Sequence, residues 1–121
     1  MEKNITVRLT ARLFAEEKCY GPGVEQLLKA VEKHRSLRAA AASMSMAYSK
    51  AWSIIRAAEQ GFGCKLLHST IGGAGGGGAV LTDEARQIMD AYGEYCRRLN
   101  EYGQTLFGEL FGFCGFCAKE G

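Results

Sequence analysis

The chain has 121 residues, of which 47% are hydrophobic, and this size allows one domain with a modest core. Fifteen Lys and Arg residues against thirteen Asp and Glu residues give a net charge of +2, a balance that by itself does not indicate a nucleic-acid partner. The five cysteines lack the spacing of a disulfide framework, no apolar run reaches transmembrane length, and the N-terminus lacks the pattern of a secretory signal. We therefore expect a cytoplasmic protein with reduced thiols and no membrane-spanning segment.

The N-terminal third predicts a strand followed by a helix. Apolar and polar residues alternate from residue 5 to residue 13, which predicts a half-buried strand with a polar outer face. Arg8 and Arg12 on that face are either simply exposed to solvent, the interpretation that we favour, or in contact with a phosphate. Residues 14–20 are ambiguous and are compatible with a return strand, and Gly21-Pro22-Gly23 then interrupts the regular structure. Apolar residues recur every three or four positions over residues 24–34, which predicts a supporting helix.

Two further helices are expected in the middle of the chain. Residues 37–43 are almost pure alanine behind Ser36, a good N-cap residue, and predict a short, closely packed helix. Residues 48–59 predict a second helix that ends through glycine capping in the segment Gly61-Phe62-Gly63. Its expected buried stripe comprises Ala51, Ile54, Ile55 and Ala58, extended by Phe62.

The opposite face of the second helix carries hydroxyls, an indole and cations. Such a surface suits the phosphates and base edges of a DNA major groove, which a recognition helix contacts with its first turns. The candidate base contacts on this face are Tyr48, Ser49, Lys50, Trp52, Ser53 and Arg56.

A hairpin with a glycine-rich loop follows. We expect a first strand over residues 64–68 and a second strand that ends at Thr82, so the whole segment has the plan of a winged helix-turn-helix. The loop is either a wing tip whose backbone amides lie against DNA or a plain connector, and it is not a nucleotide-binding loop, because no Gly-Lys-Ser/Thr follows it. The candidate phosphate contacts are Arg35, Arg38, Lys65, His68, Ser69, Thr70 and the loop residues Gly72, Gly73, Gly75, Gly76, Gly77 and Gly78.

The charge of the chain is concentrated around this motif. Residues 32–68 contain six Lys and Arg residues and two Glu residues, a net +4, which leaves −2 for the rest of the chain. The basic window coincides with the surface that the motif would present to DNA.

The last third predicts a long helix over residues 83–112, capped by Thr82. Its apolar residues alternate three- and four-residue steps, which is typical of a coiled-coil seam: Ala85, Ile88, Tyr92, Tyr95, Leu99, Tyr102 and Leu106. One small domain does not easily cover such a helix, so we expect a homodimer that presents two recognition helices. The alternative is that the N-terminal strand region covers the seam within one chain.

The tail, residues 113–121, contains a Cys-x-x-Cys motif at Cys114 and Cys117. The motif could bind Zn²⁺ if two tails of a dimer, or Cys96, supplied the remaining ligands, or it could switch between dithiol and disulfide. The alternative is an apolar tail that packs on its partner.

The middle of the chain resembles a known family. Tyr48-x-x-Ala51-Trp52 and the segment Gly-Gly-x-Gly-Gly-Gly-Gly-Ala-x-Leu-Thr from Gly72 to Thr82 resemble the N-terminal DNA-binding domain of ModE-type, molybdate-responsive regulators, and more distantly the LysR-type winged helix. Ala47 stands where the family usually has Ser, which would cost about 1 kcal/mol of helix capping unless Ser45 substitutes. The sequence also stops where the molybdate-binding domains of that family would begin, so control by molybdenum is implied by kinship alone.

We therefore predict a mainly α protein with a small β component. Residues 1–82 would form the winged helix-turn-helix with its N-terminal strand, residues 83–112 the dimerisation helix, and residues 113–121 the cysteine tail. The predicted function is sequence-specific binding of double-stranded DNA in transcriptional regulation. The alternatives are a metal- or thiol-responsive DNA-binding sensor and a winged-helix protein-interaction module. No catalytic constellation supports an enzyme.

Overall fold

The computed structural model describes residues 5–70 and 78–114. The chain divides into two compact units, residues 11–90 and the segments 1–10 and 91–121. Within the described residues, no helix has the length and apolar character needed to span a membrane.

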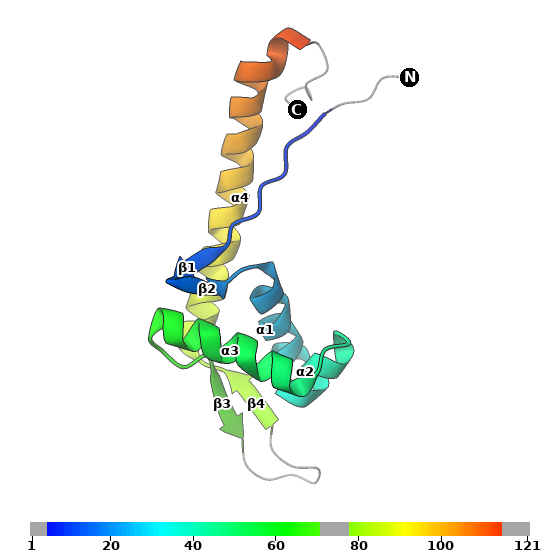
Figure 1. Ribbon diagram of the computed structural model, residues 1–121, viewed down its shortest axis with the longest axis vertical. Helices are drawn as coiled ribbons and strands as arrows, with labels where there is room; N and C mark the ends of the chain where they lie inside the picture. The colour runs from blue at the N-terminus through cyan, green and yellow to red at the C-terminus, as the bar shows by residue number, and fades with distance from the viewer. Residues whose placement is uncertain (1–4, 71–77, 115–121) are drawn as a thin grey trace. The chain divides into compact units, whose positions relative to one another are not determined.

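Three helices build the unit of residues 11–90 (Figure 1): α1 (Pro22–His34), α2 (Leu37–Ser43) and α3 (Tyr48–Phe62). Each has a stripe of apolar residues that meets the others in one core. The largest fully buried side chains of that core are Tyr20, Leu27, Leu28, Val31, Ile55 and Leu66. The helix-turn-helix arrangement of α2 and α3 is as the sequence predicts.

The ends of α2 and α3 follow local chemistry. The hydroxyl of Ser36 accepts a hydrogen bond from the N–H of Ala39 at 2.8 Å, which confirms it as the N-cap of α2. The N-cap position of α3 is Ala47, and no side chain in the described part of the chain caps that helix. Gly63 ends α3 with a left-handed φ of 74°, and its N–H donates to the carbonyl of Glu59.

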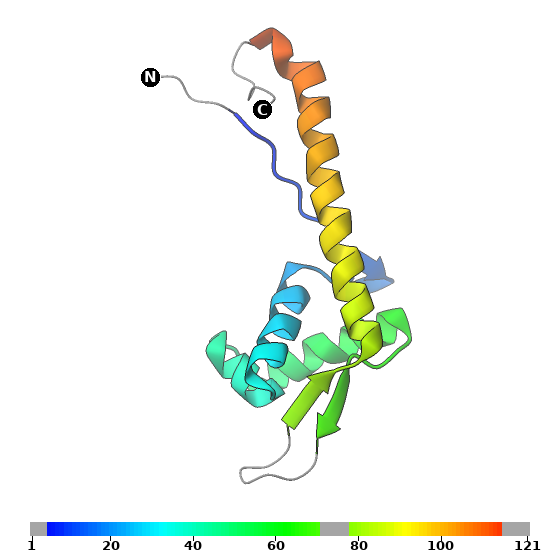
Figure 2. The same cartoon turned by 180° about the vertical axis from the view of Figure 1, so that it is seen from behind.

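The wing consists of the antiparallel strands β3 (Leu67–Thr70) and β4 (Gly78–Leu81), paired with His68 opposite Val80. Figure 2 shows β4 on the side of α1, where the N–H of Ala79 donates to the carbonyl of Arg35 at 3.0 Å. The first wing strand starts later than the predicted residues 64–68. The N–H of Leu66 donates to the Glu59 carboxylate rather than to a strand partner, so residues 64–66 anchor the wing to α3.

A second, smaller hairpin lies before α1. Strands β1 (Leu13–Ala15) and β2 (Glu17–Tyr20) pair in antiparallel fashion around Glu16, whose φ is 73°. The return strand expected over residues 14–20 therefore exists, but Leu13 is the only residue of the predicted strand 5–13 that β1 contains. That part of the prediction is wrong.

The N-terminal segment pairs with a helix instead of a strand. The N–H of Val7 donates to the side-chain oxygen of Gln104, and the N–H of Leu9 donates to that of Asn100 at 2.8 Å. The Asn100 amide in turn donates to the carbonyl of Leu9. Side-chain amides thus satisfy the backbone groups that a neighbouring strand would otherwise bind.

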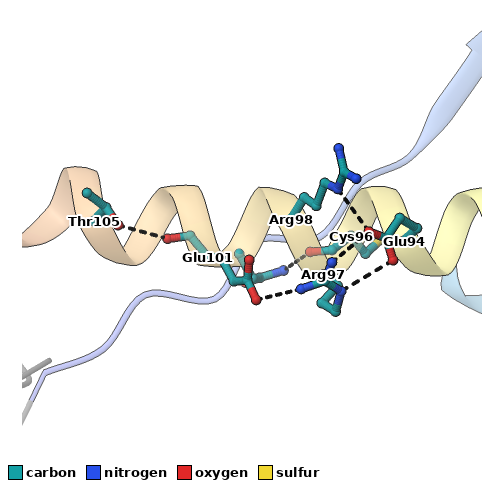
Figure 3. Close-up of polar contacts among 7 residues, drawn as sticks. Glu94, Cys96, Arg97, Arg98, Glu101 and Thr105 are labelled. Atoms are coloured by element: carbon teal, nitrogen blue, oxygen red, sulfur yellow. Dashed lines mark hydrogen bonds and ion pairs between the residues drawn. The ribbon is translucent and has the colours of Figure 1, made fainter. Parts of the chain in front are cut away.

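Helix α4 (Asp83–Phe111) is the long C-terminal helix that the sequence predicts, followed by the short 3₁₀ turn η1 (Gly112–Cys114). The Thr82 hydroxyl accepts from the N–H of Ala85 at 3.0 Å and donates to the carbonyl of Lys65, so the predicted cap also holds the wing. Farther along α4, Arg97 and Arg98 form ion pairs with Glu94, and Arg97 also pairs with Glu101 (Figure 3). The fold is mainly α with two small two-stranded sheets, as predicted.

Candidate nucleic-acid interface

The outer face of α3 presents the side chains that the sequence analysis assigned to base contacts. Five of the six are exposed and Tyr48 is half-buried; the exposed ones are Ser49, Lys50, Trp52, Ser53 and Arg56. The opposite stripe is buried at Ala51, Ile55 and Ala58, whereas Ile54 is half-buried. Phe62 was expected to extend the buried stripe, but it is 38% exposed and contacts only the edge of Tyr20 among the described rings.

Gln60 belongs to the same outer face but is absent from the predicted site. It is exposed and lies four residues after Arg56 and seven after Ser53, so the three side chains form one row along α3. The prediction ended the helix at residue 59, whereas α3 continues to Phe62. Of the two glycines in the segment predicted to end the helix, Gly61 is still helical and Gly63 is the left-handed cap, so the turn that carries Gln60 belongs to α3.

A groove of about 500 Å³ lies between α3, the start of α2 and the wing. The groove is lined by hydroxyls and cations that the sequence analysis assigned separately to base and phosphate contacts, among them Arg38, Tyr48, Trp52, Lys65, Ser69 and Gly78. The structure therefore brings these six candidates together on one surface. The other described residues of the lining, which were not predicted, are Ser36, Leu37, Glu59, Leu67 and Ala79.

Three of the groove residues contact one another through the side chain of Tyr48. The guanidinium of Arg38 lies 4.1 Å from the centre of the Tyr48 ring, and the Trp52 indole N–H donates to the Tyr48 hydroxyl at 2.8 Å. The indole N–H is therefore already used in an intramolecular hydrogen bond at the surface, while the Tyr48 hydroxyl still has its own proton to donate. Trp52 faces the wing-side groove, with an apolar surface that is still 40% exposed.

Glu59 is the only carboxylate among the described residues of the groove, and it acts as a structural anchor. Its carboxylate accepts the N–H of Leu66 at 2.9 Å and so joins the last turns of α3 to the wing. Burial raises the pKa of the neighbouring Cys64 thiol, and the negative charges of Glu84 and Glu59 raise it further. A raised pKa lowers the fraction of the Cys64 side chain that is present as thiolate.

The remaining wing candidates lie on two different faces, because successive strand residues point to opposite sides. Ser69 lines the groove, whereas His68 and Thr70 are exposed at the alternate positions of β3. Arg35 is also separate from the groove. It lines a separate pocket beside β4 with Val80 and with Arg86, and Arg86 forms an ion pair with Glu32.

Several predicted residues lie outside the described part of the chain. They are Gly72, Gly73, Gly75, Gly76 and Gly77 of the loop and Cys117 of the tail, and of Cys114 only the backbone is described. Within residues 5–70 and 78–114, no three side chains of the metal-binding types gather in one place. Zinc binding by Cys114 and Cys117 stays a prediction.

Comparison with known proteins places this geometry in a family. The model of the bacterial regulatory helix-turn-helix proteins of the lysR family matches residues 26–86, which span α1, α2, α3 and the wing up to the start of α4. The DNA-binding transcriptional dual regulator ModE of Escherichia coli K12 is 32% identical over 88 residues, 73% of this chain and 32% of that protein.

Two other relatives extend the comparison. The molybdenum transport protein ModE of Herbaspirillum seropedicae is 30% identical over 101 residues, 84% of this chain and 34% of that protein. The molybdenum-pterin-binding protein MopB of Rhodobacter capsulatus is 34% identical over 67 residues, 55% of this chain and 25% of that protein. The chain thus spans between a quarter and about a third of these relatives. It belongs to the bacterial regulatory helix-turn-helix proteins of the lysR family and is ModE-like in that region.

Proposed function

We propose that the chain is a sequence-specific DNA-binding transcriptional regulator and not an enzyme. The observation that carries the proposal is the outer face of α3, where Ser49, Ser53, Arg56 and Gln60 are exposed beside a groove that holds Arg38 and Lys65. A helix with this composition fits a major groove, and cations beside it fit the phosphate backbone. A DNA-binding role agrees with the cytoplasmic location expected from the sequence and with the names of the ModE relatives.

The residues divide into two roles. The row of Ser53, Arg56 and Gln60 supplies donors and acceptors for base edges, and the Arg56 guanidinium suits the two acceptors of guanine. Arg38 and Lys65 in the groove, with the Tyr48 hydroxyl, supply phosphate contacts that fix the register of α3 on the duplex.

The protein would act as a homodimer through α4. The N-terminal segment covers one side of this helix, where Leu9 fits against Gly103 so closely that a Cβ there would lie 2.7 Å from the leucine Cδ1. The side with Tyr95, Tyr102, Leu106 and Leu110 is left exposed, although it is apolar. The uncovered apolar side is the one that a second copy would bury.

Selection from a random DNA pool at two salt concentrations tests the function. We expect an enriched inverted repeat bound by two copies of the chain. Weak, unselective binding that modest salt abolishes would contradict a sequence-specific regulator.

Two substitutions separate the proposed roles. Arg56→Ala should cost on the order of 1–3 kcal/mol and relax the preference at one base pair. Lys65→Ala should weaken all sequences alike and reduce the slope of log affinity against log salt by about 0.9. If both variants kept the selected sequence and the salt slope of the parent, these residues would not belong to the interface.

A further inference from the structure

A second cavity, of about 280 Å³, lies on the other side of α3. Helix α3 contributes Ser53, Ile54 and Ala57 to it, whereas Tyr48, Trp52 and Glu59 face the wing-side groove. The exposed row of Ser53, Arg56 and Gln60 therefore runs between two hollows, one on the wing side and one on the side of the β1–β2 hairpin.

Two cationic side chains line the second cavity. Arg12 precedes β1 and Lys18 lies in β2, and both side chains are exposed at its rim. Among the described residues, neither of them takes part in an ion pair, and the described lining of the cavity contains no carboxylate. Two cations that line one hollow and form no described ion pair favour an anionic ligand.

The stem of Arg12 is held in place. A Cβ on Gly21 would lie 3.3 Å from the Arg12 Cγ, so the arginine packs directly over the backbone before α1. The floor of the cavity is apolar at Ile54 and Ala57. This combination of a charged rim and an apolar floor suits a sugar–phosphate unit, which has an anionic group on an apolar ring.

A helix that lies in a major groove has a phosphate backbone on each side, because the groove is only about 12 Å wide. We propose that the Arg12–Lys18 cavity binds a backbone phosphate of the DNA on the side of α3 opposite the wing. This inference rests on the proposed function. It makes the β1–β2 hairpin a second phosphate-contacting element, so the recognition helix is held between two backbones.

The test compares three double variants on the selected DNA site. In Arg12→Gln/Lys18→Gln both cations are removed, in Arg12→Lys/Lys18→Arg they are kept, and Lys29→Gln/Lys33→Gln removes the same charge from the exposed side of α1. Loss of the contacts to one phosphate should lower the salt slope by about 0.9, so the ratio of affinities at 50 and 200 mM salt should fall about 3.5-fold. The conservative and the α1 variants should keep the slope of the parent, and melting curves check that each variant folds.

DNA with single phosphates replaced by neutral methylphosphonates locates the contact. The parent should lose affinity when phosphates on either side of the recognition helix are neutralised, and the Arg12→Gln/Lys18→Gln variant should stay sensitive on the wing side only. An unchanged slope with full sensitivity on both sides would overturn the inference and leave the regulator intact. Stabilisation of the parent by millimolar inorganic phosphate, with an unchanged slope in the variant, would also overturn it, because the cavity would then hold a free anion. If the parent selected no sequence, the proposed function would fall first.

Discussion

The two units of the chain differ in how completely they cover their own apolar surface. In residues 11–90, the side chains of Leu27, Leu28, Ile55 and Leu66 are entirely buried. In the C-terminal half of α4, Tyr102 is 69% exposed and Leu110 is 61% exposed. The helix-turn-helix unit therefore has a core of its own, whereas the C-terminal half of α4 exposes apolar side chains of the kind that mark interaction sites.

The largest effect should come from breaking the completed core. Ile55→Ala removes a fully buried side chain of α3 and should cost about 2–5 kcal/mol of unfolding free energy. Tyr102→Ala removes an exposed one and should change the stability of the monomer by about 0.5 kcal/mol or less. Thermal melts at low protein concentration measure both quantities.

The same pair of variants separates stability from association. Tyr102→Ala should weaken the proposed dimer, since tyrosines often dominate interfaces, and sedimentation equilibrium would detect the loss. A Tyr102→Ala variant that associated as the parent does, or that unfolded as readily as Ile55→Ala, would remove the contrast between the units.

The second effect concerns a glycine that the wing requires. A Cβ on Gly78 would lie 2.8 Å from the carbonyl of Arg35 and 2.6 Å from the Thr70 hydroxyl, so β4 would have to move away from α1. Gly78→Ala should cost about 1–3 kcal/mol. Gly93→Ala in α4 is the matched control. It meets no atom within 4 Å and should instead stabilise the chain by about 0.5–1 kcal/mol. Destabilisation by both substitutions, in denaturant titrations, would show that the sites do not differ in packing.

The third effect is a gain at the start of the recognition helix. Ala47 has the extended φ of −65° and ψ of 144° of an N-cap residue but no side-chain oxygen. Ala47→Ser should therefore stabilise the unit of residues 11–90 by about 1 kcal/mol, and Ala47→Val, which also lacks a side-chain oxygen, serves as a control. Equal melting temperatures for the Ser variant and the parent would mean that the cap is satisfied in another way.

The helix-turn-helix could be predicted because its information is local. The Ser36 and Thr82 caps, the alanines of α2 and the glycine at residue 63 each act within one turn of their own position. The exposed face of α3 follows from the same period, so the exposure of most of its candidate residues could be predicted.

The failures concern partners that are distant in the sequence. The alternation over residues 5–13 predicts a strand, but Asn100 and Gln104, more than ninety positions away, bind the backbone of that segment. The second cavity could not be predicted for the same reason, since Arg12, Lys18 and Ser53 line it together only in the folded chain. The spacing of residues along the sequence does not predict contacts between such distant segments.

The smallest effect tests whether the ion pairs of Glu94 with Arg97 and Arg98 stabilise the part of α4 whose apolar side chains are exposed. Hydrogen bonds from Arg97 and then from Arg98 lower the pKa of the Glu94 carboxyl from 4.5 to about 2. Because the folded-state pKa is the lower one, any stabilisation is present above pH 4.5 and is lost as the pH falls toward 2. Arg97→Gln should raise the pKa of Glu94 toward its ordinary value, which an NMR titration of the side-chain carboxyl measures. All three side chains are exposed to solvent, so we expect this titration to shift while the melting temperature at neutral pH hardly changes. A large drop in melting temperature would instead mean that the ion pairs, and not a second copy of the chain, hold this part of α4 in place.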